Sequence, residues 1–208
     1  MFIRNEPFRF FLKHYPVTSL ILAVNLLIFL VLYISGTWHV APVFAYNVFQ
    51  FMVGSNAMIL QGAWWQLITP IFLHISFSHF LFNAFSIFLF APALEALLGR
   101  LKFLLAFLGT GIIANIAVLF LESPGFSHNG ASGAVFGLFG IYLYLVIFRK
   151  ELIPRPDQTI IIVLLVLGLI SSFLYPNIDI KGHLTGFLAG LALAPLLFLN
   201  VRFRSSRK

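Results

Sequence analysis

Four polar residues stand within long apolar stretches, where uncompensated polar side chains are costly. They are Ser132, His183, His79 and Asn83. A serine hydroxyl becomes a useful nucleophile when a base within hydrogen-bond reach takes its proton, and imidazole can serve as that base. His79 and Asn83 are four residues apart and project from one helical face. Their N–H groups suit the negative charge that develops on a carbonyl oxygen in a tetrahedral intermediate. Because no Asp or Glu lies in any span at this depth, the pattern predicts a dyad without a triad acid.

Ser132 belongs to the sequence Gly130-Ala131-Ser132-Gly133, which leads into an apolar helix. Glycine permits a tight backbone turn before the helix. Backbone N–H groups in the first helical turn have no intrahelical partner and can receive an oxyanion. The segment therefore predicts a serine placed beside free backbone donors.

Small residues predict which helices meet at this serine. Two stripes of glycine recur at helical spacing, and stripes of this kind let membrane helices approach closely. If the stripes face each other, His183 is drawn to Ser132, and Phe136 packs against the imidazole one turn below. The stripes are Gly133, Gly137 and Gly140 in one segment and Gly182, Gly186 and Gly190 in another.

Composition predicts the elements that position these residues. Of the 208 residues 61% are apolar and 9% are charged, against roughly 45–50% and roughly 25% in soluble domains. The fold class expected is all-α, a polytopic transmembrane helical bundle in one domain over residues 1–208. The absence of cysteine excludes disulfides, thiolate zinc sites and a thiol nucleophile. Six spans are predicted, at residues 17–35, 79–97, 103–121, 132–148, 159–175 and 183–200.

The basic residues predict the orientation of the spans. All of the 13 lysines and arginines except Lys181 lie at one set of span ends, so the net charge of +7 reflects topology rather than nucleic-acid binding. The N-terminal segment 1–16 and the basic tail 201–208 are then both cytoplasmic. The second, fourth and sixth spans all begin at the outer face. Ser132, His183, His79 and Asn83 therefore share one depth near that face.

The segment between the first two spans, residues 36–78, contains many aromatic residues and no Lys or Arg. Trp and Tyr favour the headgroup region of a bilayer, so we expect an outer loop partly embedded in lipid. Five further polar residues are not assigned to the chemistry of Ser132, His183, His79 and Asn83. Glu95 is expected to pair with Arg100 or Lys102 or to face solvent, and Asn25 and Asn115 are expected to make interhelical hydrogen bonds. Asp179 and Lys181 are expected in a loop.

These motifs together resemble the rhomboid intramembrane serine proteases. The resemblance runs from GAWWQLITPIFLH at 62–74 through His79-x-x-x-Asn83 and GASG at 130–133 to GHLTG at 182–186. It implies a six-helix core, Ser132 as nucleophile and His183 as general base and then acid. It also implies Asn83, His79 and the Ser132 N–H as oxyanion donors, with Gly130, Gly133, Phe136 and Gly186 in support. The resemblance also implies that no metal or cofactor is used.

The resemblance further implies that the substrates are transmembrane proteins, which are cut near the outer leaflet of the membrane. The compact six-span core fits a prokaryotic plasma membrane. Three positions depart from the family pattern. Gln66 stands where an arginine is frequent, Phe136 where a tyrosine is common, and Thr185 where a glycine is frequent. None of them removes a dyad or oxyanion residue.

Two other functions are open at this point, and the oligomeric state is not readable. A catalytically silent relative would bind membrane proteins without cutting them, although such relatives generally lose the serine or the histidine. A transporter would place polar groups near the midplane and show paired half-repeats, and this chain shows neither. Zinc and aspartyl protease chemistry lack their motifs, since the chain has no His-Glu-x-x-His and no intramembrane aspartate pair.

Overall fold

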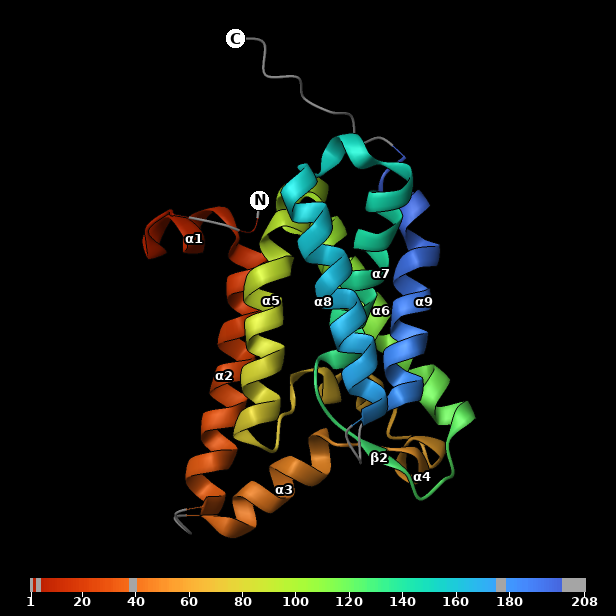
Figure 1. Ribbon diagram of the computed structural model, residues 1–208. Helices are drawn as coiled ribbons and strands as arrows, with labels where there is room; N and C mark the ends of the chain where they lie inside the picture. The colour runs from red at the N-terminus through yellow and green to blue at the C-terminus, as the bar shows by residue number, and fades with distance from the viewer. Residues whose placement is uncertain (1, 3–4, 38–40, 175–178, 200–208) are drawn as a thin grey trace.

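The long apolar segments form helices, because a helix satisfies its own backbone hydrogen bonds where no water is available. The computed structural model describes residue 2 and residues 5–37, 41–174 and 179–199 (Figure 1). Its helices are α1 (Phe8–His14), α2 (Pro16–Thr37), α3 (Pro42–Met52), α4 (Asn56–Leu60), α5 (Phe77–Leu98), α6 (Arg100–Leu121), α7 (Ser132–Phe148), α8 (Arg155–Leu174) and α9 (Ile180–Leu197). Three short 3-10 segments are η1 (Trp64–Leu67), η2 (Thr69–Phe72) and η3 (Lys150–Leu152), and two strands are β1 (Gly54–Ser55) and β2 (Ser127–His128).

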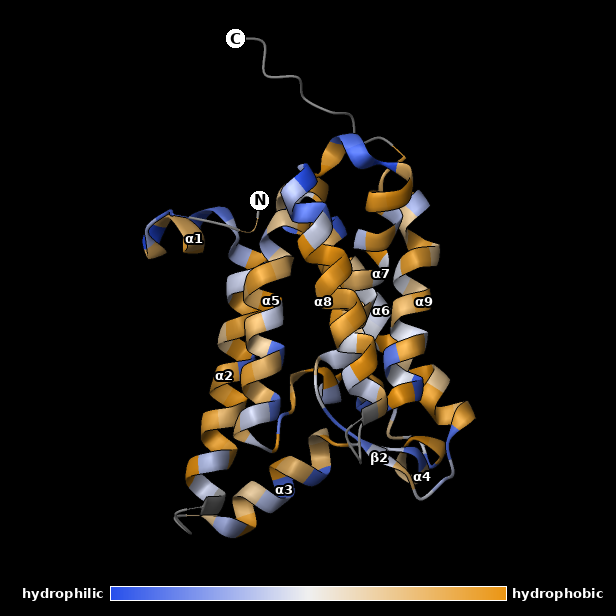
Figure 2. Ribbon diagram, viewed as in Figure 1, coloured by the Kyte–Doolittle hydropathy of each residue, from blue (hydrophilic) through white to orange (hydrophobic). Residues whose placement is uncertain are grey.

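Six of these helices make up the membrane bundle. In the described residues α2, α5, α6, α8 and α9 are long and apolar enough to cross a bilayer, and α7 is shorter, with 17 residues. Leu138, Ile141 and Tyr142 of α7 are completely buried. As the central helix, α7 meets other helices rather than lipid, so its length of roughly 26 Å is not set by the bilayer. The predicted all-α bundle of six spans is confirmed, and Figure 2 shows that hydrophobic residues predominate along its long helices.

The chain passes up and down the bundle in turn. The first residues of α5, α7 and α9 therefore lie at one end, where α3, α4 and β2 also lie, and α1 lies at the other end (Figure 1). His79, Ser132 and His183 all fall in the first turn of their helices. The alternation of the helices thus brings these three residues to one level of the bundle.

The segment predicted as a loop at 36–78 is largely structured. Helix α2 continues to Thr37 and α5 begins at Phe77. Between them lie α3, β1, α4, η1 and η2. Strand β1 pairs antiparallel with β2, with Gly54 opposite His128. Helices α6 and α8 also begin earlier than predicted, because a helix can extend past the apolar run into its charged flank. The tail 201–208 and the predicted span ends at 175 and 200 lie outside the described residues.

The expectation for Glu95 is wrong. Its side chain is buried, with 2% exposed, and it contacts the first turn of α2 rather than Arg100 or Lys102. The carboxylate accepts the backbone N–H of Val17 at 3.0 Å and that of Thr18 at 2.8 Å. It also accepts the Thr18 hydroxyl at 2.7 Å. The first N–H groups of a helix need partners from outside the helix, and Glu95 on α5 supplies them for α2.

We predict that Glu95→Ala lowers the free energy of unfolding by about 2–3 kcal/mol, since it leaves buried donors without an acceptor. Thermal unfolding of the purified protein in detergent measures this change. The matched control is Glu151→Ala, which removes an exposed carboxylate paired with Arg149 and should leave the melting temperature nearly unchanged. Equal melting temperatures for the two variants would contradict the capping role.

Candidate active site

The two glycine stripes bring α7 and α9 into backbone contact. A Cβ atom at Gly186 would overlap the carbonyl oxygen of Gly133, and one at Gly190 would overlap that of Gly137. Such an approach is possible only where neither helix carries a side chain at the contact. The N-terminal residues of the two helices are thereby held beside each other.

Ser132 and His183 line one small cavity at this contact, together with the backbone of Gly133 and Gly182. The cavity measures about 20 Å³, which leaves room for a water molecule but not for a peptide. His183 is buried, with 9% exposed. A hydroxyl and an imidazole from two different helices therefore share one enclosed space.

The imidazole of His183 is held on two sides. The ring of Phe136 stacks on it with centroids 4.3 Å apart and an angle of 16° between the planes. The hydroxyl oxygen of Ser172, on α8, lies 2.8 Å from Nδ1. Together these contacts fix the plane of the ring and occupy one nitrogen, so Nε2 is the nitrogen left for another partner. Ser172 was not among the residues predicted for the site, although a serine within an apolar span is a signal that the sequence carries.

The turn before α7 depends on Gly130. Its φ of 111° is in the region that favours glycine, and a Cβ there would overlap the ring of His79. The N–H of Gly130 donates to the carbonyl of Pro70 at 2.8 Å. The next N–H, of Ala131, donates to Nε2 of His74 at 3.3 Å. The segment that precedes α5 therefore holds the serine turn in place and puts His79 beside it.

Asn83 lies one helical turn after His79 and is buried, with 6% exposed. Its Nδ2 donates to the carbonyl oxygen of His79 at 2.9 Å. A carboxamide nitrogen carries two hydrogens, so a second N–H is available to another acceptor. Among the described residues, those that line the 20 Å³ cavity include neither Asn83 nor His79. His79 reaches the cavity wall through its contact with Gly130.

Comparison with known proteins places the chain in a family. The family model described as the rhomboid domain matches residues 61–200, a range that includes the cavity and the helices around it. The chain belongs to the rhomboid family. With its apolar helices, this rhomboid is an integral membrane protein.

Several curated rhomboids are similar to this one. YdcA of Bacillus subtilis (strain 168), which is named as a candidate rhomboid protease, is 44% identical over 207 residues, with 100% of each chain covered. Rhomboid protease GluP of the same organism is 36% identical over 182 residues, which cover 88% of this chain and 35% of GluP. Rhomboid-like protease 1 of Toxoplasma gondii is 29% identical over 207 residues, covering 93% of this chain and 69% of the other. The similarity to YdcA thus extends over the whole bundle.

Two polar residues that the sequence analysis set apart line the cavity of this rhomboid. Asn115 of α6 was expected to lie away from the residues that carry the chemistry. It lies at the cavity instead, and its Nδ2 donates to the carbonyl oxygen of Leu67 at 2.9 Å. Asp179 was expected in a loop, but it caps α9 by accepting the N–H of Gly182 at 2.8 Å. An Asp just before an apolar helix is a capping signal. Burial raises the pKa of this carboxyl above its usual value.

His128 also lines the cavity. It is buried, with 7% exposed, and neither ring nitrogen has a hydrogen-bond partner among the described residues. Burial lowers the pKa of His128 to about 4, so the ring is neutral near pH 7. A neutral imidazole in this position can exchange hydrogen bonds with water or with a bound peptide.

Gln66 and Thr185, which depart from the rhomboid pattern, both make hydrogen bonds within the structure. Gln66 is 1% exposed, donates to the carbonyl of Gln50 at 3.0 Å and accepts the N–H of Ser55 at 3.2 Å. This side chain therefore anchors the segment between α2 and α5 without a guanidinium. Thr185 donates to the carbonyl of Lys181 at 2.7 Å within its own helix.

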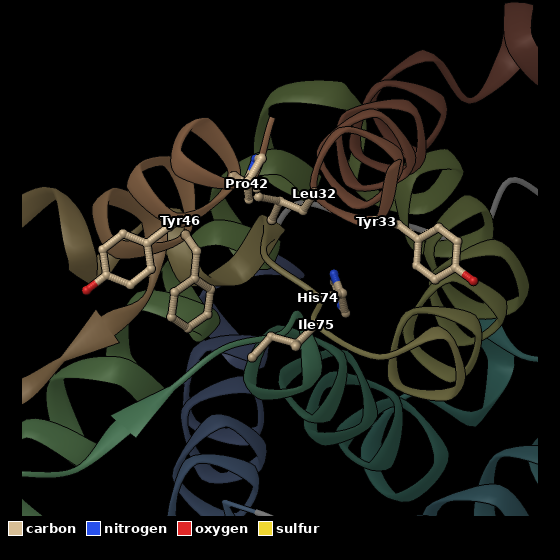
Figure 3. Close-up of a pocket in the computed structure, with 8 residues that line it drawn as sticks. Leu32, Tyr33, Pro42, Tyr46, His74 and Ile75 are labelled. Carbon is tan, nitrogen blue, oxygen red and sulfur yellow. The ribbon is translucent and has the colours of Figure 1, made fainter. Parts of the chain in front are cut away.

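A second and larger cavity, of about 430 Å³, is lined by His74, as Figure 3 shows. Its walls are mainly apolar and come from α2, α3 and the segment before α5. Burial, and then the proximity of His79, lower the pKa of His74 to about 3. Its ring is therefore neutral, as its acceptor role toward Ala131 requires. No cluster of three or more metal-binding side chains occurs in the part of the chain that the structure describes.

Proposed function

We propose that this rhomboid is an intramembrane serine endopeptidase that cuts transmembrane segments through a Ser132–His183 dyad. The observation that carries the proposal is the shared cavity of Ser132 and His183, with the imidazole held by Phe136 and Ser172. The names of YdcA and GluP support the same activity class.

In the proposed reaction, the Ser132 hydroxyl attacks the carbonyl carbon of a peptide bond while Nε2 of His183 takes its proton. The resulting oxyanion is received by the Ser132 N–H, His79 and the second N–H of Asn83, each worth up to about 3–4 kcal/mol when well placed. His183 then gives the proton to the leaving amine, and an acyl-enzyme forms. Water, deprotonated by His183, hydrolyses this ester and restores the serine.

The proposal includes an orientation in the membrane. The basic residues of the described chain other than Lys181 belong to the end of the bundle opposite the cavity. Because basic residues favour the cytoplasmic side, we propose that both termini are cytoplasmic and that the site opens toward the outer side of a plasma membrane. These residues are Arg9, Lys13, Arg100, Lys102, Arg149, Lys150 and Arg155.

Substrate access requires movement, since the cavity of about 20 Å³ does not admit a peptide. Helical peptide bonds are also protected by their own hydrogen bonds. Preferred substrates therefore carry small or helix-breaking residues near the cut, because these lower the cost of unwinding.

Labelling by a fluorophosphonate tests the proposal directly. Purified protein in detergent should react, and mass spectrometry of the adduct should place the label on Ser132. Incubation with a model membrane substrate should give two fragments cut near the outer end of its helix. A protein that binds the substrate but neither reacts nor cuts it would support the alternative, a catalytically silent scaffold.

A further inference from the structure

The hydroxyl of Ser172 has two polar neighbours. Its Oγ lies 2.8 Å from Nδ1 of His183 and 2.9 Å from the carbonyl oxygen of Gly168. Ser172 is buried, with 2% exposed. On the same helix, a Cβ at Gly168 would lie 3.5 Å from the ring of Phe136. This face of α8 therefore packs against the stacked pair of Phe136 and His183.

Counting hydrogens decides the direction of the two bonds. A carbonyl oxygen can only accept, and a serine hydroxyl has one hydrogen. If that hydrogen goes to Gly168, Nδ1 of His183 can donate its own hydrogen to Ser172, and both contacts are hydrogen bonds. If the hydroxyl instead donates to Nδ1, no hydrogen is left for the Gly168 contact. The arrangement in which Ser172 donates to Gly168 and accepts from Nδ1 of His183 makes two hydrogen bonds rather than one. It is therefore favoured for these buried polar groups.

We propose that Ser172 is a positioning residue that keeps the hydrogen of neutral His183 on Nδ1. Nε2 then carries the lone pair that a general base needs. The inference rests on the proposed function, because it assigns Ser172 the orienting role that a carboxylate has in a serine triad. When Nε2 takes the proton of Ser132, the ring becomes an imidazolium, and Ser172 still accepts from Nδ1–H. The hydrogen bond therefore persists through both protonation states of the base.

Ser171 provides a matched control on the same helix. Its hydroxyl donates to the same carbonyl, that of Gly168, at 2.8 Å. Within the described part of the chain its side chain makes no hydrogen bond to His183, whereas that of Ser172 makes one. Alanine at either position removes one hydroxyl that bonds to Gly168, but only Ser172→Ala removes the partner of the imidazole.

The experiment measures cleavage and tautomer in the same variants. We expect Ser172→Ala to lower kcat by about 10- to 100-fold, with little change in KM. Loss of the hydrogen-bond partner that orients a metal-binding histidine has an effect of this size. Ser171→Ala should match the wild type. Ser172→Thr keeps the hydroxyl. Valine has the same shape as threonine but lacks the hydroxyl, so Ser172→Thr should retain much more activity than Ser172→Val. Equal rates for threonine and valine would overturn the inference, because size alone would then explain the loss.

Nitrogen-15 NMR of ring-labelled protein reads the tautomer without any need for activity. The chain has six histidines, and the signals missing from His183→Gln identify those of His183. We expect Nδ1 of neutral His183 to be protonated in wild type and in Ser171→Ala, and the proton to be shared between both nitrogens in Ser172→Ala. An unchanged tautomer in Ser172→Ala would refute the positioning role. If the wild type neither cuts nor labels, the proposed function fails while the NMR result still tests Ser172.

Discussion

Replacing Ser132 or His183 by alanine is expected to lower kcat for a model membrane substrate by on the order of 10⁴-fold or more. Each change removes one half of the proton transfer that makes the hydroxyl nucleophilic. The double variant should be no worse than either single variant by more than a few-fold, because the two residues act as one unit. Initial rates of substrate cleavage in detergent or proteoliposomes measure this effect, and fluorophosphonate labelling gives a second reading.

The control for Ser132→Ala is Ser127→Ala. Ser127 is an exposed serine in β2, five residues before Ser132, and its loss should leave the rate unchanged. Thermal unfolding should give similar melting temperatures for all of these variants. Cleavage by Ser132→Ala at the wild-type rate would eliminate the proposed nucleophile.

A side chain at Gly186 is expected to separate α7 from α9. In Gly186→Val the first side-chain carbon already overlaps the carbonyl oxygen of Gly133, and backbone atoms on both sides cannot move aside as a flexible side chain can. We expect the free energy of unfolding to fall by at least about 3 kcal/mol. Cleavage should also be lost, since a shift of about 1 Å between nucleophile and base costs on the order of 100-fold in rate.

Gly109 gives the matched control for this change. It lies in α6, and a Cβ there would have no atom within 4 Å. Gly109→Ala should therefore keep both the melting temperature and the rate, or raise stability slightly because alanine favours the helix. If Gly186→Val melts at the temperature of Gly109→Ala, the close contact between α7 and α9 does not determine the site.

The prediction from sequence was most accurate where one physical constraint dominated. The apolar content required membrane helices, and all six were located to within a few residues. The glycine spacing predicted the contact of α7 with α9, because only small residues allow two backbones to meet. It was least accurate for single polar residues such as Glu95, for which a charged neighbour in the sequence seemed the natural partner. The actual partners, Val17 and Thr18, lie almost eighty residues away in the chain.

The sequence by itself therefore determined the class of fold, the family and the chemical types at the site. Hydrophobic periodicity, composition and short motifs can be read from the sequence alone, without knowledge of which residues are neighbours in the fold. The sequence predicted Phe136 as a contact of His183, and the stacking of the two rings confirms it. Only the tertiary structure added Ser172, because this residue comes from a third helix, α8. In the same way it brought Asn115 and Asp179 to the cavity and turned the amide of Asn83 toward its own helix. Contacts of this kind depend on the rotation of each helix about its axis, which is set by packing against all of its neighbours at once.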